Sequence, residues 1–156
     1  MTATVNIGGV DFSRTKDFTV AKQAEATVVT SFAEAIALGK DAYVKIQGVT
    51  FLSKVSNGYY FTDGVNNLFV FTSGLTIETG DVVDLTGIVA EYYGYAQLAG
   101  STEKPVLVTP SEAAAKEPVI VDSTIEYIIA NCTAETGDMK LHTMYRITGR
   151  VYHAPN

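Results

Sequence analysis

Alternating apolar and polar positions dominate the middle of the chain, between Ala42 and Leu98. The period of two residues is typical of strands with one buried face. Clusters of Ser, Asn, Gly and Asp interrupt the alternation where tight turns are expected. The pattern predicts five short strands, with a further short run at Val106–Val108: Val44–Val55, Tyr59–Thr62, Leu68–Thr72, Val82–Tyr92 and Tyr95–Leu98.

Gly48 and Gly87 each lie inside one of the two long predicted strands. A glycine in a strand pattern indicates a bulge or a bend. Two long strands that bend can each pair with two neighbours and so close a barrel without exposed sheet edges. The alternation then assigns one set of apolar side chains to the barrel interior: Val44, Ile46, Val83, Leu85 and Val89.

The stretch VKIQGVTFLSKVSNGYYFTDGVNNLFVF…GDVVDLTGIVAEYYGYAQL resembles the OB-fold, and the resemblance covers roughly Val28 to Val108. It is similar to the OB domains of extracellular bacterial nucleases and of Bacteroidetes surface proteins. The resemblance implies an all-β domain built on a five-stranded Greek-key barrel. The chain departs from many OB domains at Ser73–Asp81, where only a loop fits between the third and fourth strands.

The segments that flank the predicted barrel carry weaker signals. Thr30–Gly39 predicts a short helix, because Thr30 or Ser31 is placed to cap its start, Glu34 suits a capping box, and Gly39 suits its end. Met1–Val20 predicts one or two strands. The sequence SEAAAK, at 111–116, fits either a single helical turn or an exposed linker.

The C-terminal segment repeats part of this pattern. Val119–Ile128 matches Thr27–Ile36 at an offset of 92 residues, and Tyr145–Gly149 parallels Val44–Gly48. This match predicts the beginning of a second OB-like unit. The alternative is chance, because Ile147–Val151 also matches Leu85–Val89. The predicted organisation is an N-terminal strand-like arm (1–26), an OB-fold barrel (27–110), a linker (111–118) and a partial second unit or docking extension (119–156).

Composition narrows the classes of function. The net charge of −6 disfavours broad attraction to a phosphate backbone. No signal-peptide pattern and no apolar run of 18 residues is visible, so no membrane insertion is expected. Two locations are compatible with these observations. The protein is either made in the cytoplasm and incorporated into a virion, or it is a piece of a secreted surface protein.

Residues with catalytic or metal-binding chemistry are few. Neither His142 nor His153 has a Cys or carboxylate at metal-ligand spacing, and Cys132 is more typical of a small buried residue than of a nucleophile. Asp63, Asp81 and Asp84 lie at turns, where Asp accepts hydrogen bonds from backbone N–H groups. We therefore expect no metal, no cofactor and no enzymatic activity.

Aromatic residues are the strongest candidates for contact with a ligand or partner. Ligands of OB domains bind across the second and third strands, between two flanking loops. Tyr59 and Phe61 are predicted to share one face of their strand, with Tyr60 on the opposite face. The candidate residues, with the two nearest cations, are Tyr59, Tyr60, Phe69, Phe71, Tyr92, Tyr93, Tyr95, Lys45 and Lys54.

These observations favour a non-catalytic module that contacts other proteins in a larger assembly, either a cell-surface protein or an accessory component of a virion. Strand-like segments at both ends suit contact with a protein partner or self-assembly. The first alternative is a single-stranded nucleic-acid-binding protein, since aromatic side chains can stack on bases. A carbohydrate-binding accessory domain is a third reading of the same tyrosines.

Overall fold

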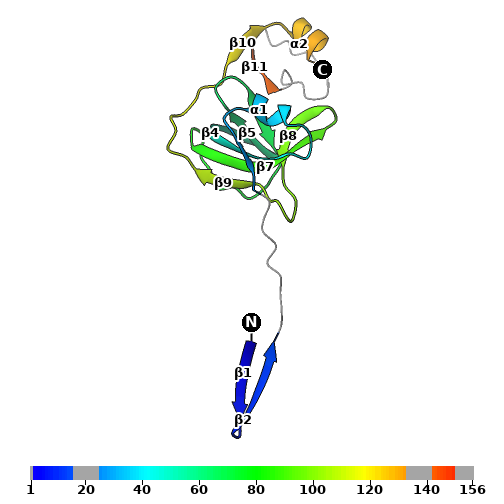
Figure 1. The fold of residues 1–156 in the computed structure, drawn as a ribbon. Helices are drawn as coiled ribbons and strands as arrows, with labels where there is room; N and C mark the ends of the chain where they lie inside the picture. The colour runs from blue at the N-terminus through cyan, green and yellow to red at the C-terminus, as the bar shows by residue number, and fades with distance from the viewer. Residues whose placement is uncertain (1, 16–24, 133–141, 150–156) are drawn as a thin grey trace, which may run out of the picture.

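A computed structural model of the chain describes residues 2–15, 25–132 and 142–149. Its centre is a closed five-stranded barrel, as the all-β OB-like prediction required (Figure 1). Around the barrel each strand pairs with the next in the order β4-β5-β6-β8-β7, and β7 pairs again with β4. The barrel strands are β4 (Tyr43–Val55), β5 (Gly58–Thr62), β6 (Asn67–Val70), β7 (Val82–Tyr92) and β8 (Tyr95–Ala99).

Strand β4 closes the barrel because it bends at Gly48. Its first half pairs with β7, its second half pairs with β5, and the β7 register shifts between Ile46 and Val49. Gly48 has a φ of 62°, a conformation that favours glycine. The predicted bulge is therefore confirmed.

Gly87 has a different role. The β7 register shows no shift at this position, and a Cβ atom there would lie 2.8 Å from the Leu98 side chain. Close packing of β7 on β8, rather than a bulge, accounts for this glycine.

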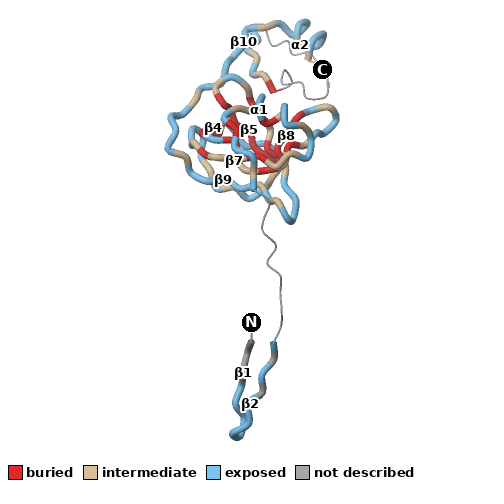
Figure 2. The backbone as a smooth tube through the Cα atoms, viewed as in Figure 1, coloured by how far each residue is buried: buried red, intermediate tan, exposed pale blue. Residues whose placement is uncertain are grey.

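The core lies inside the barrel and follows the predicted alternation (Figure 2). All five residues assigned to the interior are buried, and so are Tyr59 and Phe61, while Tyr60 lies on the other face of β5. The buried apolar residues form one cluster. No described helix is long and apolar enough to span a membrane.

A short β-α-β unit leads into the barrel. Strand β3 (Thr27–Val29) runs parallel to β4, and helix α1 (Phe32–Ala37) connects them. Ser31 caps the helix by accepting a hydrogen bond from the Glu34 backbone N–H, as predicted. Asp63 ties the helix to the barrel, because its Oδ2 accepts from the Phe32 N–H at 2.8 Å and its Oδ1 accepts from the β5–β6 turn.

After the barrel, β9 (Leu107–Pro110) pairs with the outer edge of β7, and the connection between β6 and β7 is a loop without a helix, as expected. Residues 111–118 form no helical turn and run along β4. There the Lys116 N–H donates to Thr50 Oγ1 at 2.7 Å, and Ala113 packs against Gly48. The linker reading of SEAAAK therefore holds.

The C-terminal segment repeats the β-α-β arrangement. Strand β10 (Ile120–Ser123) runs parallel to β11 (Met144–Ile147), and helix α2 (Ile125–Asn131), capped by Thr124, lies between them in sequence. The register differs from that of the first unit. Val28 is opposite Lys45, whereas Arg146, which aligns with Lys45, is opposite Asp122.

The N-terminal strands β1 (Thr2–Ile7) and β2 (Val10–Thr15) form an antiparallel hairpin, drawn in blue in Figure 1. Ile7 is opposite Val10, and Val5 lies two residues before Ile7 in β1, so these three apolar positions share one face of the hairpin. Val5, Ile7 and Val10 are each more than half exposed.

Candidate functional site

Three aromatic side chains gather on the outside of the barrel, at the place where OB domains bind ligands. Tyr60 of β5 is directly opposite Phe69 of β6, with 5.4 Å between ring centroids. Tyr95 comes from β8, whose neighbouring residue Ala96 points inward. We call Tyr60, Phe69 and Tyr95 the aromatic face.

The other predicted aromatic residues lie elsewhere. Tyr59 is only 2% exposed in the core, where its hydroxyl contacts the backbone of Leu75. Phe71 follows β6 and is half exposed. Tyr92 and Tyr93 lie at the tip of the β7–β8 hairpin with their rings edge to face at 4.6 Å, and Tyr92 reaches the edge of the aromatic face.

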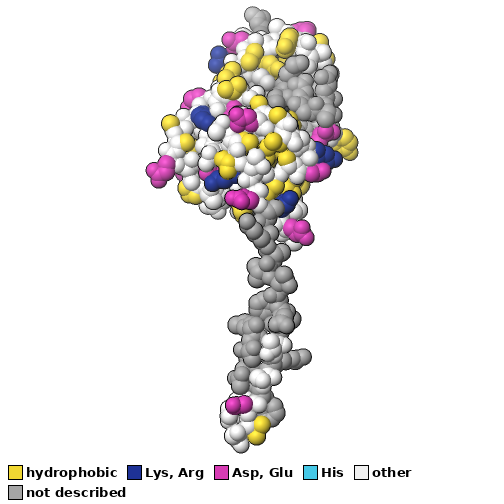
Figure 3. Space-filling model, viewed as in Figure 1, with side chains coloured by type: hydrophobic (Ala, Val, Ile, Leu, Met, Phe, Trp, Pro, Cys, Tyr) yellow, Lys and Arg dark blue, Asp and Glu magenta, His cyan; other side chains and the backbone are white. Residues whose placement is uncertain are grey.

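Neither predicted lysine lines the aromatic face. Lys45 pairs with Asp84 at 3.0 Å on the β4–β7 side of the barrel. Lys54 lies 5.9 Å from the centre of the Tyr59 ring. On the side drawn in Figure 3, Lys and Arg side chains lie apart from one another, with carboxylates between them. The described residues on this side therefore form no continuous basic track for a phosphate backbone.

His142 covers the aromatic face, which sequence reasoning did not predict. Its ring lies 6.0 Å from the Tyr60 ring and 6.4 Å from the Tyr95 ring, and the residue is 7% exposed. Its Nε2 lies 2.7 Å from the Ala96 carbonyl oxygen, and its own carbonyl accepts from the Asn67 side-chain amide at 2.8 Å. The chain's own C-terminal segment therefore occupies the usual ligand position.

Two open grooves flank the imidazole. One, of about 340 Å³, runs past Tyr60, Phe69 and Tyr95 toward the β7–β8 hairpin. The other, of about 220 Å³, lies between β4 and the segment that follows His142. The lining residues that the structure describes include no carboxylate, Lys or Arg: Leu52, Ser53, Val55, Asn57, Tyr60, Asn67, Phe69, Tyr92, Tyr95, Ala96, Gln97, His142, Thr143 and Met144.

These surroundings shift the pKa values of two side chains, His142 and Tyr60. Burial lowers the pKa of His142, and the hydrogen bond to the Ala96 carbonyl opposes that effect only in part. Burial also raises the pKa of the Tyr60 hydroxyl, with a smaller contribution from Tyr95. Both groups are therefore neutral near pH 7.

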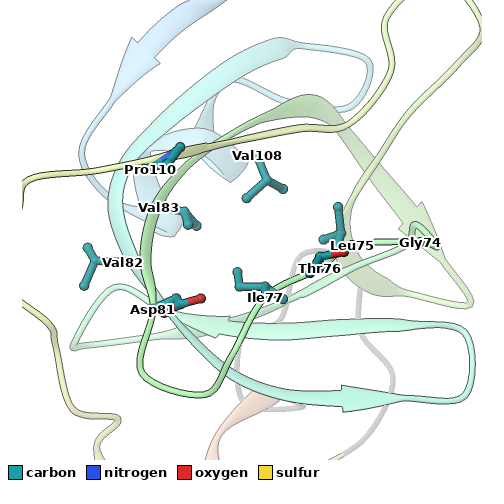
Figure 4. Close-up of a pocket in the computed structure, with 9 residues that line it drawn as sticks. All are labelled: Gly74, Leu75, Thr76, Ile77, Asp81, Val82, Val83, Val108 and Pro110. Carbon is teal, nitrogen blue, oxygen red and sulfur yellow. The ribbon is translucent and has the colours of Figure 1, made fainter.

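A further cavity of about 420 Å³ lies between the β6–β7 loop and strands β7 and β9 (Figure 4). Leu75, Ile77 and Val108 make it largely apolar. Its carboxylate, Asp81, accepts a hydrogen bond from the Glu78 N–H, which is a turn interaction. The described lining residues include no His, Cys or Lys beside Asp81.

Residues with metal-binding side chains do not cluster within 2–15, 25–132 and 142–149. Cys132 lies at the end of α2, with its Sγ 3.4 Å from the Tyr145 hydroxyl. His153 lies outside the described residues. Nothing in the described part of the chain therefore assembles the side chains of a metal centre.

The second exposed apolar surface belongs to β10, α2 and β11. Helix α2 has no buried residue, and Ile129 is 74% exposed. In the part of the chain that the structure describes, β10 and β11 pair only with each other. We call these three elements the second unit. Its exposed apolar side chains are Ile120, Val121, Ile125, Tyr127, Ile129, Met144 and Ile147.

No protein family model and no curated protein matches this chain. Among solved structures, the hypothetical protein ygiW of E. coli is similar over 60% of this chain and 100% of its own, with 16% identity and a TM-score of 0.41. This distant likeness carries no information about activity or ligand.

Proposed function

We propose that this protein is a non-catalytic interaction module that contacts other proteins in a larger assembly through its second unit. The observation that carries the proposal is the exposed apolar surface of that unit. A helix normally stabilises itself by burying its apolar side, yet Ile125 and Ile129 of α2 are 56% and 74% exposed. Apolar side chains gathered in this way are typical of a surface that binds protein.

Unpaired strand edges support the same conclusion. A two-stranded sheet is marginally stable in water, and its free N–H and C=O groups can pair with another strand. The chain has two such sheets among its described residues, the β1–β2 hairpin and the β10–β11 pair. Strand addition from one copy to the next would extend both.

We therefore take another copy of this chain as the partner to test first. The β1–β2 hairpin supplies a donor strand with an apolar face, and the second unit supplies the acceptor. A contact of this kind is head-to-tail, so it gives either a ring or an open filament. Both fit a larger assembly of the kind expected from the sequence, either a cell-surface protein or an accessory component of a virion.

Native mass measured against protein concentration tests the proposal. Ile129→Asp should reduce self-association at least tenfold, because the charge would be buried in the contact. Val65→Asp is the matched control, since Val65 is 73% exposed on the barrel's β5–β6 turn. A chain that stays monomeric at all concentrations, or that responds equally to both substitutions, contradicts the proposal.

Single-stranded nucleic acid is the second candidate, favoured by the three rings of the aromatic face. The imidazole of His142 covers that face, and the described residues that line the grooves beside it include no Lys or Arg. We expect no complex with mixed-sequence single-stranded DNA tighter than about micromolar at physiological salt. Fluorescence anisotropy with a labelled oligonucleotide checks this. A nanomolar, salt-sensitive complex that Tyr60→Ala abolishes would replace the protein-binding proposal.

A further inference from the structure

The contact between His142 and the barrel joins two parts of the chain that are 46 residues apart. The acceptor at Nε2 is the backbone carbonyl of Ala96, and a carbonyl oxygen can only accept. Nε2 therefore carries the hydrogen, and the neutral ring leaves Nδ1 without one. Nδ1 is buried, and no residue that the structure describes forms a hydrogen bond with it.

We infer that His142 makes a pH-sensitive contact. Its neutral ring holds the C-terminal segment, residues 142–149, on the aromatic face, and protonation of the ring releases the segment and uncovers the face. The inference goes beyond the proposed assembly, because it concerns access to the barrel's own ligand position and not the exposed side of the second unit.

Protonation is unfavourable in the docked position for two reasons. It adds an N–H donor at Nδ1, a buried atom for which the described residues supply no hydrogen-bond partner, and it places a charge on a residue that is only 7% exposed. Released into water, the same imidazolium is fully hydrated. The docked position therefore favours the neutral ring.

Among the residues that the structure describes, no charged side chain lines the grooves around the ring. The titratable groups that line the grooves around the ring are the phenols of Tyr60, Tyr92 and Tyr95. The described groove-lining residues of β4, β6 and the segment after His142 are uncharged, and they include Ser53, Asn67 and Thr143. Glu91 is opposite Ala96 in the β7–β8 ladder, but it lines a different groove together with Lys40.

The contact between His142 and the barrel also leaves some hydrogen-bonding atoms without partners, as expected for a contact that can be released. Asn67 donates its amide to the His142 carbonyl, yet its buried Oδ1 has no partner. Asn67 Oδ1 and His142 Nδ1 are both buried without a partner among the described residues, so the contact is weaker than one in which every polar atom is hydrogen-bonded. A modest penalty from protonation is then enough to shift the equilibrium.

The direction of the pH effect follows from the lowered pKa of docked His142. Above about pH 6.5 the ring is neutral whether docked or free, and docking has its full strength. Below that value the free segment takes up a proton that the docked one resists. Docking should weaken by about tenfold per pH unit until the docked ring itself protonates.

The test is a pH titration of the full-length, isotope-labelled chain by NMR between about pH 7.5 and 5. We expect the His142 ring to titrate below its ordinary range, and the amide signals of Phe69 and Gln97 to shift with it. In His142→Gln, whose side chain can still donate an N–H but cannot take up a proton, these amides should lose their pH response. His153→Gln, at the other histidine of the sequence, is the matched control and should keep it.

Two results would overturn the inference. One is a wild-type barrel whose Phe69 and Gln97 amides do not move between pH 7.5 and 5 while the fold persists. The other is a full pH response in His142→Gln. The wild-type titration is informative even if the substituted chain does not fold, and the native mass measured at both pH values separates this release from any change in self-association.

Discussion

The chain contains two β-α-β units with the same local design and different surroundings. In both, two parallel strands are joined through a short helix whose first turn is capped by a hydroxyl side chain, Ser31 or Thr124. The first residue of each helix is large and apolar. Phe32 is 0% exposed in the first unit, whereas Ile125 is 56% exposed in the second.

The difference comes from what each unit packs against. Strand β4 of the first unit pairs with β3, β5 and β7, and Asp63 bonds the start of α1 to the barrel. Among described residues β11 pairs with β10 alone, and α2 buries nothing. Capping and strand propensity are thus enough to shape a unit, while its stability depends on the rest of a barrel.

The largest expected contrast is between Phe32→Ala and Ile125→Ala. Removing a fully buried Phe should cost about 3–5 kcal/mol of the free energy of unfolding. The exposed Ile should cost less than about 0.5 kcal/mol. Urea denaturation followed by circular dichroism measures both.

Equal losses in the two variants would show that the second unit is buried in solution. Repeating the Ile125→Ala measurement over a range of protein concentrations then identifies the cause, because burial in an assembly makes the loss depend on concentration.

A second contrast uses two aspartates. Asp63→Ala leaves the Phe32, Val65 and Asn66 N–H groups without their acceptor, and we expect a loss of about 2–3 kcal/mol. Asp122, in an exposed pair with Arg146, should tolerate Ala with no measurable change. Thermal unfolding of both variants checks this, and a larger effect at Asp122 than at Asp63 would reverse the comparison.

The two caps provide a third contrast. Ser31→Ala should lower barrel stability by about 1 kcal/mol, since α1 is part of the cooperative core. Thr124→Ala removes an equivalent bond, to the Tyr127 N–H, but should only fray α2 and leave the urea midpoint unchanged. Hydrogen exchange of the α2 amides separates the two outcomes, and a shifted midpoint in Thr124→Ala would mean that the second unit unfolds with the barrel.

Much of the barrel could be predicted from the sequence because its signals are local. Alternation selected the interior residues, and an interrupted strand pattern located the bulge at Gly48. At Gly87 the ladder has no bulge, but β7 changes its neighbour there from β9 to β8, and the close approach of Leu98 was not visible in the local pattern. The register of β10 and β11 was equally beyond reach, since a short two-stranded pairing has few side-chain contacts to specify it.

The candidate site was harder to predict. The period of two in β5 placed Tyr59 and Tyr60 on opposite faces, but it could not show which of them faces outward or that a distant segment covers Tyr60. A lone histidine far along the chain carries no local pattern that predicts which part of the fold it will contact. Only the three-dimensional arrangement places the Ala96 carbonyl and the Asn67 amide where they hold it.

The smallest contrast concerns the two ion pairs of the units. Burial raises the pKa of the Asp84 carboxyl, but hydrogen bonds from Lys45 and the Gly48 N–H outweigh it, so the pKa lies below its ordinary value. Asp84 therefore adds stability that is complete above about pH 4 and is lost as the pH falls through the lowered pKa. Asp84→Asn should remove this contribution, of order 1 kcal/mol, and flatten the acid limb of a stability-pH curve.

The ion pair of the second unit joins Arg146 and Asp122 at 3.5 Å, and their side chains are 62% and 78% exposed. Water screens this pair, so Arg146→Gln should leave the whole curve unchanged. An altered acid limb in Arg146→Gln would place the second unit's ion pair in a protected contact and remove the distinction between the two units.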